Sequence, residues 1–153
     1  MYKKAREHLL KYNIRPSLQR LAIVEYLLSV KSHPTADTIY SAIHTDIPTL
    51  SRTTVYTTVS MLAGRGVILA LDLDPEQMHY DGDITPHAHF LCTRCGHIYD
   101  IWFNGDGWGP LLAAAPMPQG ASVSDIQLSY KGLCADCRGM VDKHEPKTLN
   151  GRK

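Results

Sequence analysis

Long hydrophobic runs are absent from this chain of 153 residues. A helix that crosses a bilayer needs about 20 consecutive apolar residues, so the sequence predicts no transmembrane helix. The N-terminal stretch from Met1 to Glu7 is charged and no apolar stretch follows it, which argues against a secretory signal peptide. We therefore expect a cytoplasmic protein that folds as one domain or two small ones.

Cysteine is also scarce. The chain has four cysteines, and all of them lie in two C-x-x-C pairs, Cys92 with Cys95 and Cys134 with Cys137. In a reducing cytoplasm, metal binding explains such pairs better than disulfide formation does. Four thiolates fill a tetrahedral site and leave no open coordination position, which indicates a structural zinc. Four free buried thiols are the alternative.

The net charge of +1 conceals an uneven distribution. Residues 1–66 carry nine Lys and Arg against four acids, whereas the remaining residues carry seven against eleven. A basic half joined to an acidic half rich in metal ligands suggests a nucleic-acid binder coupled to a sensor. The alternative is a chance bias between two unrelated halves.

Helical spacing of apolar residues predicts four helices in the first half, with Leu10 and Leu28 among the side chains that point inward. Two strands, at 67–73 and 77–80, are expected to follow, so the pattern indicates a winged helix-turn-helix. The predicted helices are Lys3–Tyr12, Leu18–Val30, Ala36–Ile43 and Arg52–Arg65, and the last three begin after the N-cap residues Ser17, Thr35 and Ser51.

The fourth predicted helix is the candidate recognition helix, because its first turns are rich in hydroxyl groups. When such turns enter a major groove, outward side chains reach phosphates and base edges. The alternative is an ordinary helix with a polar face. The candidate DNA-contacting residues are Arg15, Ser51, Arg52, Thr53, Tyr56 and Thr57.

Four motifs, spread over about residues 5–138, together carry a resemblance to a known family. The chain resembles the ferric uptake regulator (Fur) family of metal-dependent repressors, and most of all its peroxide-responsive members. The motifs are His33-Pro34-Thr35-Ala36, Ser51-Arg52-Thr53-Thr54-Val55-Tyr56, His87-Ala88-His89 before Cys92-x-x-Cys95-Gly96, and Cys134-x-x-Cys137.

The resemblance implies an α+β fold. An N-terminal winged helix-turn-helix that binds DNA would occupy residues 1–80, a small α/β dimerisation domain residues 81–140, and a disordered tail residues 141–153. The implied partners are double-stranded operator DNA and a second copy of the chain, with no membrane. The implied elements of the second domain are strands near 89–102 and 122–133, paired across a two-fold axis, and a short helix near 110–115.

The resemblance also implies two metal sites. His87 and His89 are spaced i, i+2, which places both rings on one face of a strand. A mixed site of histidines and carboxylates suits Fe(II), Mn(II) or Zn(II). The implied ligands of a regulatory Fe2+ or Mn2+ are His33, Asp81, His87, His89 and Asp100, and those of a structural Zn2+ are Cys92, Cys95, Cys134 and Cys137.

Taken singly, three of these residues have a structural explanation that needs no metal. His33 could be a turn histidine, Asp81 a cap at the end of a strand, and Asp100 a solvated strand residue. Many members of the family carry a further metal site, which we predict to be absent here. Its positions hold residues whose side chains cannot ligate, namely Pro86, Ala88, Gly107 and Ile126.

The nature of the signal depends on Asp100. Peroxide-sensing members resemble this chain in having Asp at both carboxylate positions, whereas iron sensors usually have Glu at the second. The sequence thus predicts a repressor in which peroxide reacts at Fe(II) and oxidises His33 or His87. The alternatives are an iron-responsive repressor of iron uptake and a zinc enzyme at His87 and His89. No nucleophile–base arrangement supports an enzyme.

Overall fold

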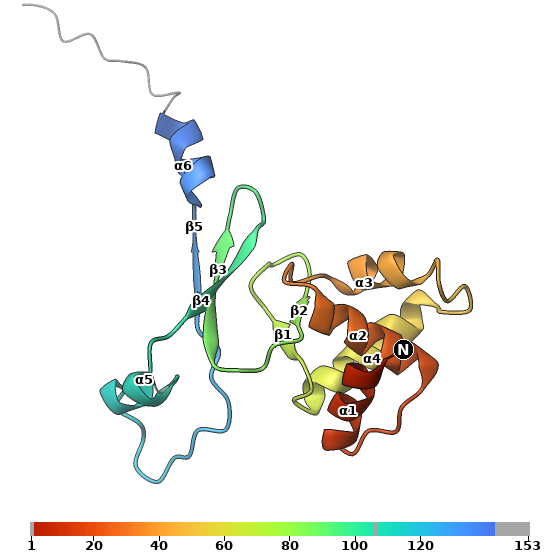
Figure 1. Ribbon diagram of the computed structural model, residues 1–153. Helices are drawn as coiled ribbons and strands as arrows, with labels where there is room; N and C mark the ends of the chain where they lie inside the picture. Colours follow the sequence, from red (N-terminus) through yellow and green to blue (C-terminus); the bar gives the residue numbers. More distant parts are fainter. Residues whose placement is uncertain (1, 106, 143–153) are drawn as a thin grey trace, which may run out of the picture. The chain divides into compact units, whose positions relative to one another are not determined.

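The computed structural model describes residues 2–105 and 107–142 (Figure 1). The chain divides into two compact units between Thr85 and Pro86, a little later than the boundary expected after residue 80. Among the described residues, no helix combines the length and the apolar character that a membrane crossing requires.

The first unit contains the four predicted helices, and each prediction is confirmed to within one residue at its end. The side-chain oxygens of Ser17, Thr35 and Ser51 each accept a hydrogen bond from the backbone N–H three residues later, at 3.0–3.3 Å, so all three N-caps are also confirmed. The helices are α1 (Lys3–Lys11), α2 (Leu18–Ser29), α3 (Ala36–Ile43) and α4 (Arg52–Gly64).

A two-stranded antiparallel wing follows, formed by β1 (Leu69–Leu71) and β2 (His79–Asp81). Both strands are shorter than predicted. Val67 and Ile68, expected to open the first strand, are instead buried in the helical core. The wing is joined to the start of α3, because the N–H of Tyr80 donates to the carbonyl oxygen of Pro34 at 3.0 Å.

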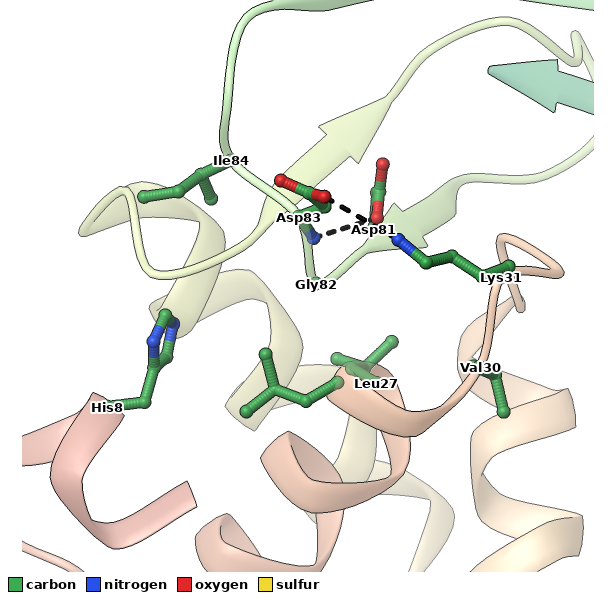
Figure 2. A pocket seen from close by; sticks show the side chains of 9 residues that line it. His8, Leu27, Val30, Lys31, Asp81, Gly82, Asp83 and Ile84 are labelled. Atoms are coloured by element: carbon green, nitrogen blue, oxygen red, sulfur yellow. Dashed lines mark hydrogen bonds and ion pairs between the residues drawn. The ribbon is translucent and has the colours of Figure 1, made fainter. Parts of the chain in front are cut away.

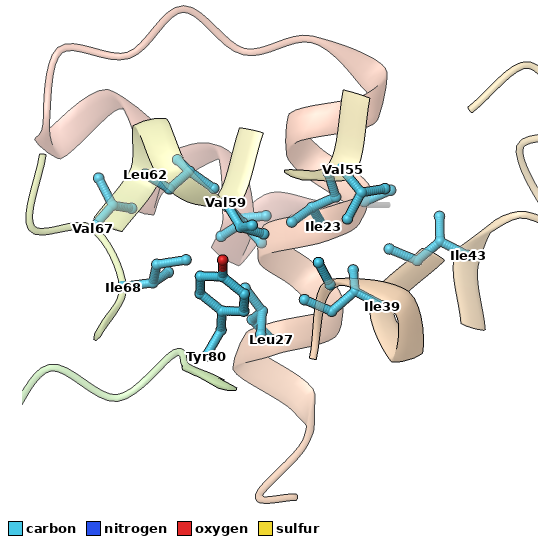
Figure 3. Packing of buried hydrophobic residues seen from close by; sticks show 14 of the residues in the cluster. Ile23, Leu27, Ile39, Ile43, Val55, Val59, Leu62, Val67, Ile68 and Tyr80 are labelled. Carbon is cyan, nitrogen blue, oxygen red and sulfur yellow. The ribbon is translucent and has the colours of Figure 1, made fainter. Parts of the chain in front are cut away.

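The core of this unit is apolar and contains side chains from all four helices and the wing (Figure 3). Leu9 and Leu27 are buried and point into this core from α1 and α2. Leu10 and Leu28 are 51% and 37% exposed, so those two predictions are wrong. Successive helix residues point about 100° apart, and in both pairs this turn carries the second leucine to the edge of the core, where solvent reaches it.

The second unit is built on a three-stranded sheet with the order β4-β3-β5. The central strand β3 pairs with β4 in antiparallel fashion and with β5 in parallel fashion. A parallel pair needs a long connection, and here residues 93–128, which include the antiparallel neighbour β4, form it. The elements are β3 (His87–Cys92), β4 (Ile98–Trp102), α5 (Gly109–Ala114), β5 (Ser129–Gly132) and α6 (Ala135–Asp142).

Two expectations for this unit need adjustment. The strand expected near 122–133 is reduced to β5, because residues 121–128 belong to no named strand. The helix expected near 110–115 is confirmed as α5. Of the disordered tail predicted at 141–153, residues 141–142 belong instead to α6, and residues 143–153 lie outside the described residues. Pairing across a two-fold axis stays a prediction.

Candidate metal centres

The four cysteines converge at one end of the three-stranded sheet. Cys92 ends β3, Cys95 lies in the following turn, Cys134 directly precedes α6, and Cys137 lies in the first turn of that helix. The four sulfur atoms all lie within 4.8 Å of one another, and those of Cys95 and Cys134 are 3.9 Å apart. With ligand bonds of about 2.3 Å, such a cluster fits a tetrahedral zinc ion.

Backbone donors prepare this cluster for negative charge. Hydrogen bonds from the N–H groups of Cys95 and Cys134 lower the pKa of the Cys92 thiol to about 6. The neighbouring sulfurs act in the opposite sense and raise the pKa of Cys137 to about 12, led by its contact with Cys134. Thiolates that disfavour one another in this way call for a shared cation, which agrees with a closed metal site.

A second potential ligand pair lies in the first unit, where the Nε2 atom of His33 and the Oδ2 atom of Asp81 are 3.6 Å apart. His33 has a positive φ of 50°. The ring nitrogen Nδ1 of His79 on β2 donates to the carbonyl oxygen of His33 at 2.6 Å and so stabilises this unusual backbone conformation. His79 matched no motif, and only the fold reveals that it positions His33.

A third group lies on the β3–β4 hairpin of the second unit, where the register places His89 opposite Asp100. The Oδ1 atom of Asp100 lies 3.5 Å from Nε2 of His87 and 3.7 Å from Nε2 of His89. Two ligand atoms that are each about 2.1 Å from one ion lie at most about 4.2 Å apart, so both groups have the spacing of metal ligands.

Trp102 stacks on this group. Its ring centroid is 4.4 Å from that of His87, with only 22° between the two planes. Sequence reasoning missed this contact, although strand pairing could have indicated it, because His87 and Trp102 are opposite one another in the β3–β4 register. The stacked indole fixes the orientation of the His87 ring on one side.

The positions of the additional family site lie on the same hairpin and on the loops beside it. A Cβ atom added to Gly107 would lie 2.9 Å from the Cβ of Pro86, and Gly107 has a positive φ of 60°. The close approach to Pro86 therefore explains why glycine occupies position 107. Absence of the additional site stays a prediction from side-chain chemistry.

The candidate DNA-contacting side chains are exposed on the first unit, as expected. The structure adds a residue that sequence reasoning missed. Asp37 on α3 forms an ion pair with Arg52 and accepts a hydrogen bond of 3.1 Å from the hydroxyl of Tyr56. The guanidinium of Arg52 also lies over the ring of Tyr40, 4.5 Å from its centroid. Asp37 thus holds two side chains of α4 in one arrangement.

Comparison with known proteins agrees with this picture. The sequence model of the Ferric uptake regulator family matches residues 11–105. The Peroxide operon regulator of Bacillus subtilis is 34% identical over 135 residues, which cover 88% of this chain and 92% of that protein. The Peroxide-responsive repressor PerR of Staphylococcus aureus is 30% identical over 125 residues, covering 82% of this chain and 83% of that one.

Solved structures show the same architecture. The ferric uptake regulator of Francisella tularensis with iron is 26% identical, has a TM-score of 0.66, and covers 82% of this chain and 95% of that one. The regulator of Pseudomonas aeruginosa with manganese, at 18% identity and a TM-score of 0.69, supports the fold alone; the alignment covers 86% of this chain and 98% of that one.

Proposed function

The chain belongs to the ferric uptake regulator family of metal-dependent transcription regulators, and we propose that it is a repressor that senses peroxide. In its metal-loaded form it binds operator DNA as a homodimer. Oxidation of a ligating histidine then releases the metal and the DNA. The identity of 34% to a peroxide operon regulator supports this choice of signal.

The observation that carries the proposal is the division of the ligands between the two units. His33 and Asp81 belong to the first unit, and His87, His89 and Asp100 belong to the second. One ion that took ligands from both units would favour a single arrangement of them and thereby set the spacing of the two α4 helices in a dimer. Metal binding would act by population shift, provided that the ion prefers this arrangement.

The regulatory ion is proposed to be Fe2+ or Mn2+, and the four-cysteine site is proposed to hold Zn2+. Histidine nitrogens with carboxylate oxygens suit the former pair of ions, whereas four thiolates suit zinc. When bound, Fe(II) would supply the redox chemistry that activates peroxide near its ligands. The imidazole of His33 or His87 would give up two electrons and exchange a C–H for a C–OH bond, and the peroxide would accept both electrons, pass one oxygen to the ring and leave the other as water.

Two alternative functions remain, an iron-responsive repressor and a zinc enzyme. An iron-responsive repressor is favoured by the similarity to the Francisella tularensis regulator solved with iron. It would bind DNA according to iron level and ignore peroxide. A zinc enzyme would turn over a hydrolytic substrate, and the relatives named above are regulators. The decisive experiment measures operator binding with Fe(II) and with Mn(II), each before and after peroxide.

Replacing Arg52 or Tyr56 by alanine is expected to weaken operator binding about tenfold or more, because each lost base or phosphate contact costs about 1–3 kcal/mol. Operator duplexes can be selected from a random pool with the Mn(II)-loaded protein, and affinity measured by fluorescence anisotropy at several salt concentrations. Binding should fall steeply with salt, since the first half is basic.

Arg65→Ala is the matched control for this test, because Arg65 caps the opposite end of α4. It should retain near-normal operator affinity, and all three variants should keep their zinc and manganese. Wild-type affinity in both Arg52→Ala and Tyr56→Ala would show that the start of α4 is not the recognition surface.

A further inference from the structure

The segment from Asp81 to Thr85 closes the first unit and lies against the C-terminal end of α2 (Figure 2). Gly82 makes the closest approach. A Cβ atom added there would lie 2.7 Å from the carbonyl oxygen of Leu27, which is backbone and cannot move aside. The segment therefore rests on α2 through its own backbone, in a position that a side chain at Gly82 would prevent.

Asp83 holds the segment together. Its Oδ1 atom accepts hydrogen bonds from the backbone N–H and the hydroxyl of Thr85, at 3.0 and 2.6 Å. Its Oδ2 atom lies 3.6 Å from the Nζ of Lys31, just beyond the end of α2. One carboxylate thus connects the turn to α2, and Figure 2 shows Lys31 reaching toward the two aspartates.

Asp81 receives its orientation from the same turn. The backbone N–H of Asp83 donates to Oδ1 of Asp81 at 2.8 Å, whereas Oδ2 of Asp81 lies 3.6 Å from Nε2 of His33. A carboxylate that is held through one oxygen presents the other in a defined place. The two oxygens of Asp81 therefore divide their roles between the turn and the histidine.

The turn is open on its other side. A cavity of about 230 Å³ is lined by His8 of α1, by the end of α2 and by residues 81–84 (Figure 2). Packing against α1 therefore gives the turn little support on this side. The contact with Leu27 and the pair of Lys31 with Asp83 hold it instead.

We propose that Lys31 and Asp83 are positioning residues that tune the affinity for the regulatory metal by holding Asp81 in its ligating orientation. The inference rests on the proposed function, because it takes Asp81 as a ligand. Groups that orient a metal ligand typically change metal affinity about 10–100-fold when they are removed. An exposed ion pair contributes less to stability, so the effect should appear in metal binding rather than in folding.

Mn(II) alone is the probe, and electron paramagnetic resonance of the free ion gives its dissociation constant. Asp83→Asn keeps an acceptor for Thr85 but loses the charge, and it should weaken Mn(II) binding about tenfold. Lys31→Met keeps the aliphatic stem and should weaken binding by a smaller factor. Lys4→Met, at an exposed position of α1, is the control and should bind Mn(II) normally. Zinc content and Tm should stay unchanged in all three.

The double variant separates a shared role from two independent ones. Because Lys31 acts through Asp83, Lys31→Met should add little to Asp83→Asn, whereas additive losses would overturn the proposed pair. If Asp83→Asn fails to fold, Lys31→Met alone decides the matter.

Asp81→Ala shows which hypothesis has failed. If it abolishes Mn(II) binding while Lys31→Met and Asp83→Asn bind like wild type, the positioning role is wrong and the metal site stands. If Asp81→Ala also binds like wild type, the proposed regulatory site itself is wrong.

Discussion

Cys95→Ser is expected to remove the structural zinc, about one ion per chain, and to split the dimer into unstable monomers. Structural zinc sites contribute on the order of 10 kcal/mol of apparent binding free energy, which is coupled to folding. Cys95 is the suitable position because its side chain is exposed, so its loss tests ligation, whereas Cys92 is also part of the packed interior. Metal content by mass spectrometry and molar mass by light scattering provide the two measurements.

The matched control for this experiment is Thr93→Ala, in the same turn. Its hydroxyl donates to the carbonyl oxygen of Gly132 at 3.1 Å and has no place among the four sulfurs. It should keep zinc and the dimer, with at most a small fall in Tm. A folded, zinc-free Cys95→Ser dimer of normal stability would refute the assignment.

Mild peroxide is expected to abolish operator binding by the Fe(II) form and to leave the Mn(II) form bound. Under the proposed mechanism the oxidised ring would no longer ligate, so the iron would leave and would no longer hold both units in one arrangement. The measurement combines anisotropy with mass spectrometry, which should detect a gain of one oxygen on the peptide that contains His33 or the one that contains His87.

The sequence offers internal controls for this measurement. After cleavage at lysine and arginine, His33 shares a peptide with His44, and His87 shares one with Met78. Met78 is 40% exposed and takes up oxygen readily, and Met78→Leu removes this source of added oxygen. Cys92 lies on the same peptide as His87, so fragment spectra must place the added oxygen on a ring. His44 should stay unmodified, because it is not among the proposed ligands.

Asp100→Glu should suppress histidine oxidation and retain metal-dependent DNA binding. Oδ1 of Asp100 lies within 3.7 Å of Nε2 of His87 and of His89. A longer side chain at this position would therefore change how the carboxylate coordinates the ion. Oxidation of Cys92 or Cys134 ahead of the rings would exclude the histidine mechanism. Binding that follows iron level alone would favour the iron-responsive reading.

Local signals predicted the parts of the fold that depend on neighbouring residues. The hydroxyl groups of Ser17, Thr35 and Ser51 mark helix starts because each accepts a hydrogen bond from a backbone N–H three residues later. Such a short separation can be recognised from the local sequence. The cysteine pairs are likewise visible as spacing. By contrast, the parallel pairing of β3 with β5 joins residues about forty positions apart, and the spacing of apolar residues along the chain does not indicate which strands pair.

The candidate sites show the same limit. Sequence motifs identified the candidate ligands and DNA-contacting residues, whereas the residues that position them could be identified only in the folded structure. His79 supports the backbone of His33, and Asp37 holds Arg52 with Tyr56. Each of these contacts crosses between elements, and a single histidine or aspartate in the sequence carries no sign of its distant partner.

The parallel pairing of β3 with β5 has a consequence for how the second unit folds. Bringing Cys92 beside Gly132 closes a loop of about forty residues, at an entropic cost of roughly 3 kcal/mol. A zinc ion held by both cysteine pairs closes almost the same loop. If the ion binds before the sheet forms, it would already have closed this loop, so the refolding rate of the second unit should rise with zinc concentration. The helices of the first unit make mostly local contacts and should fold quickly without the metal.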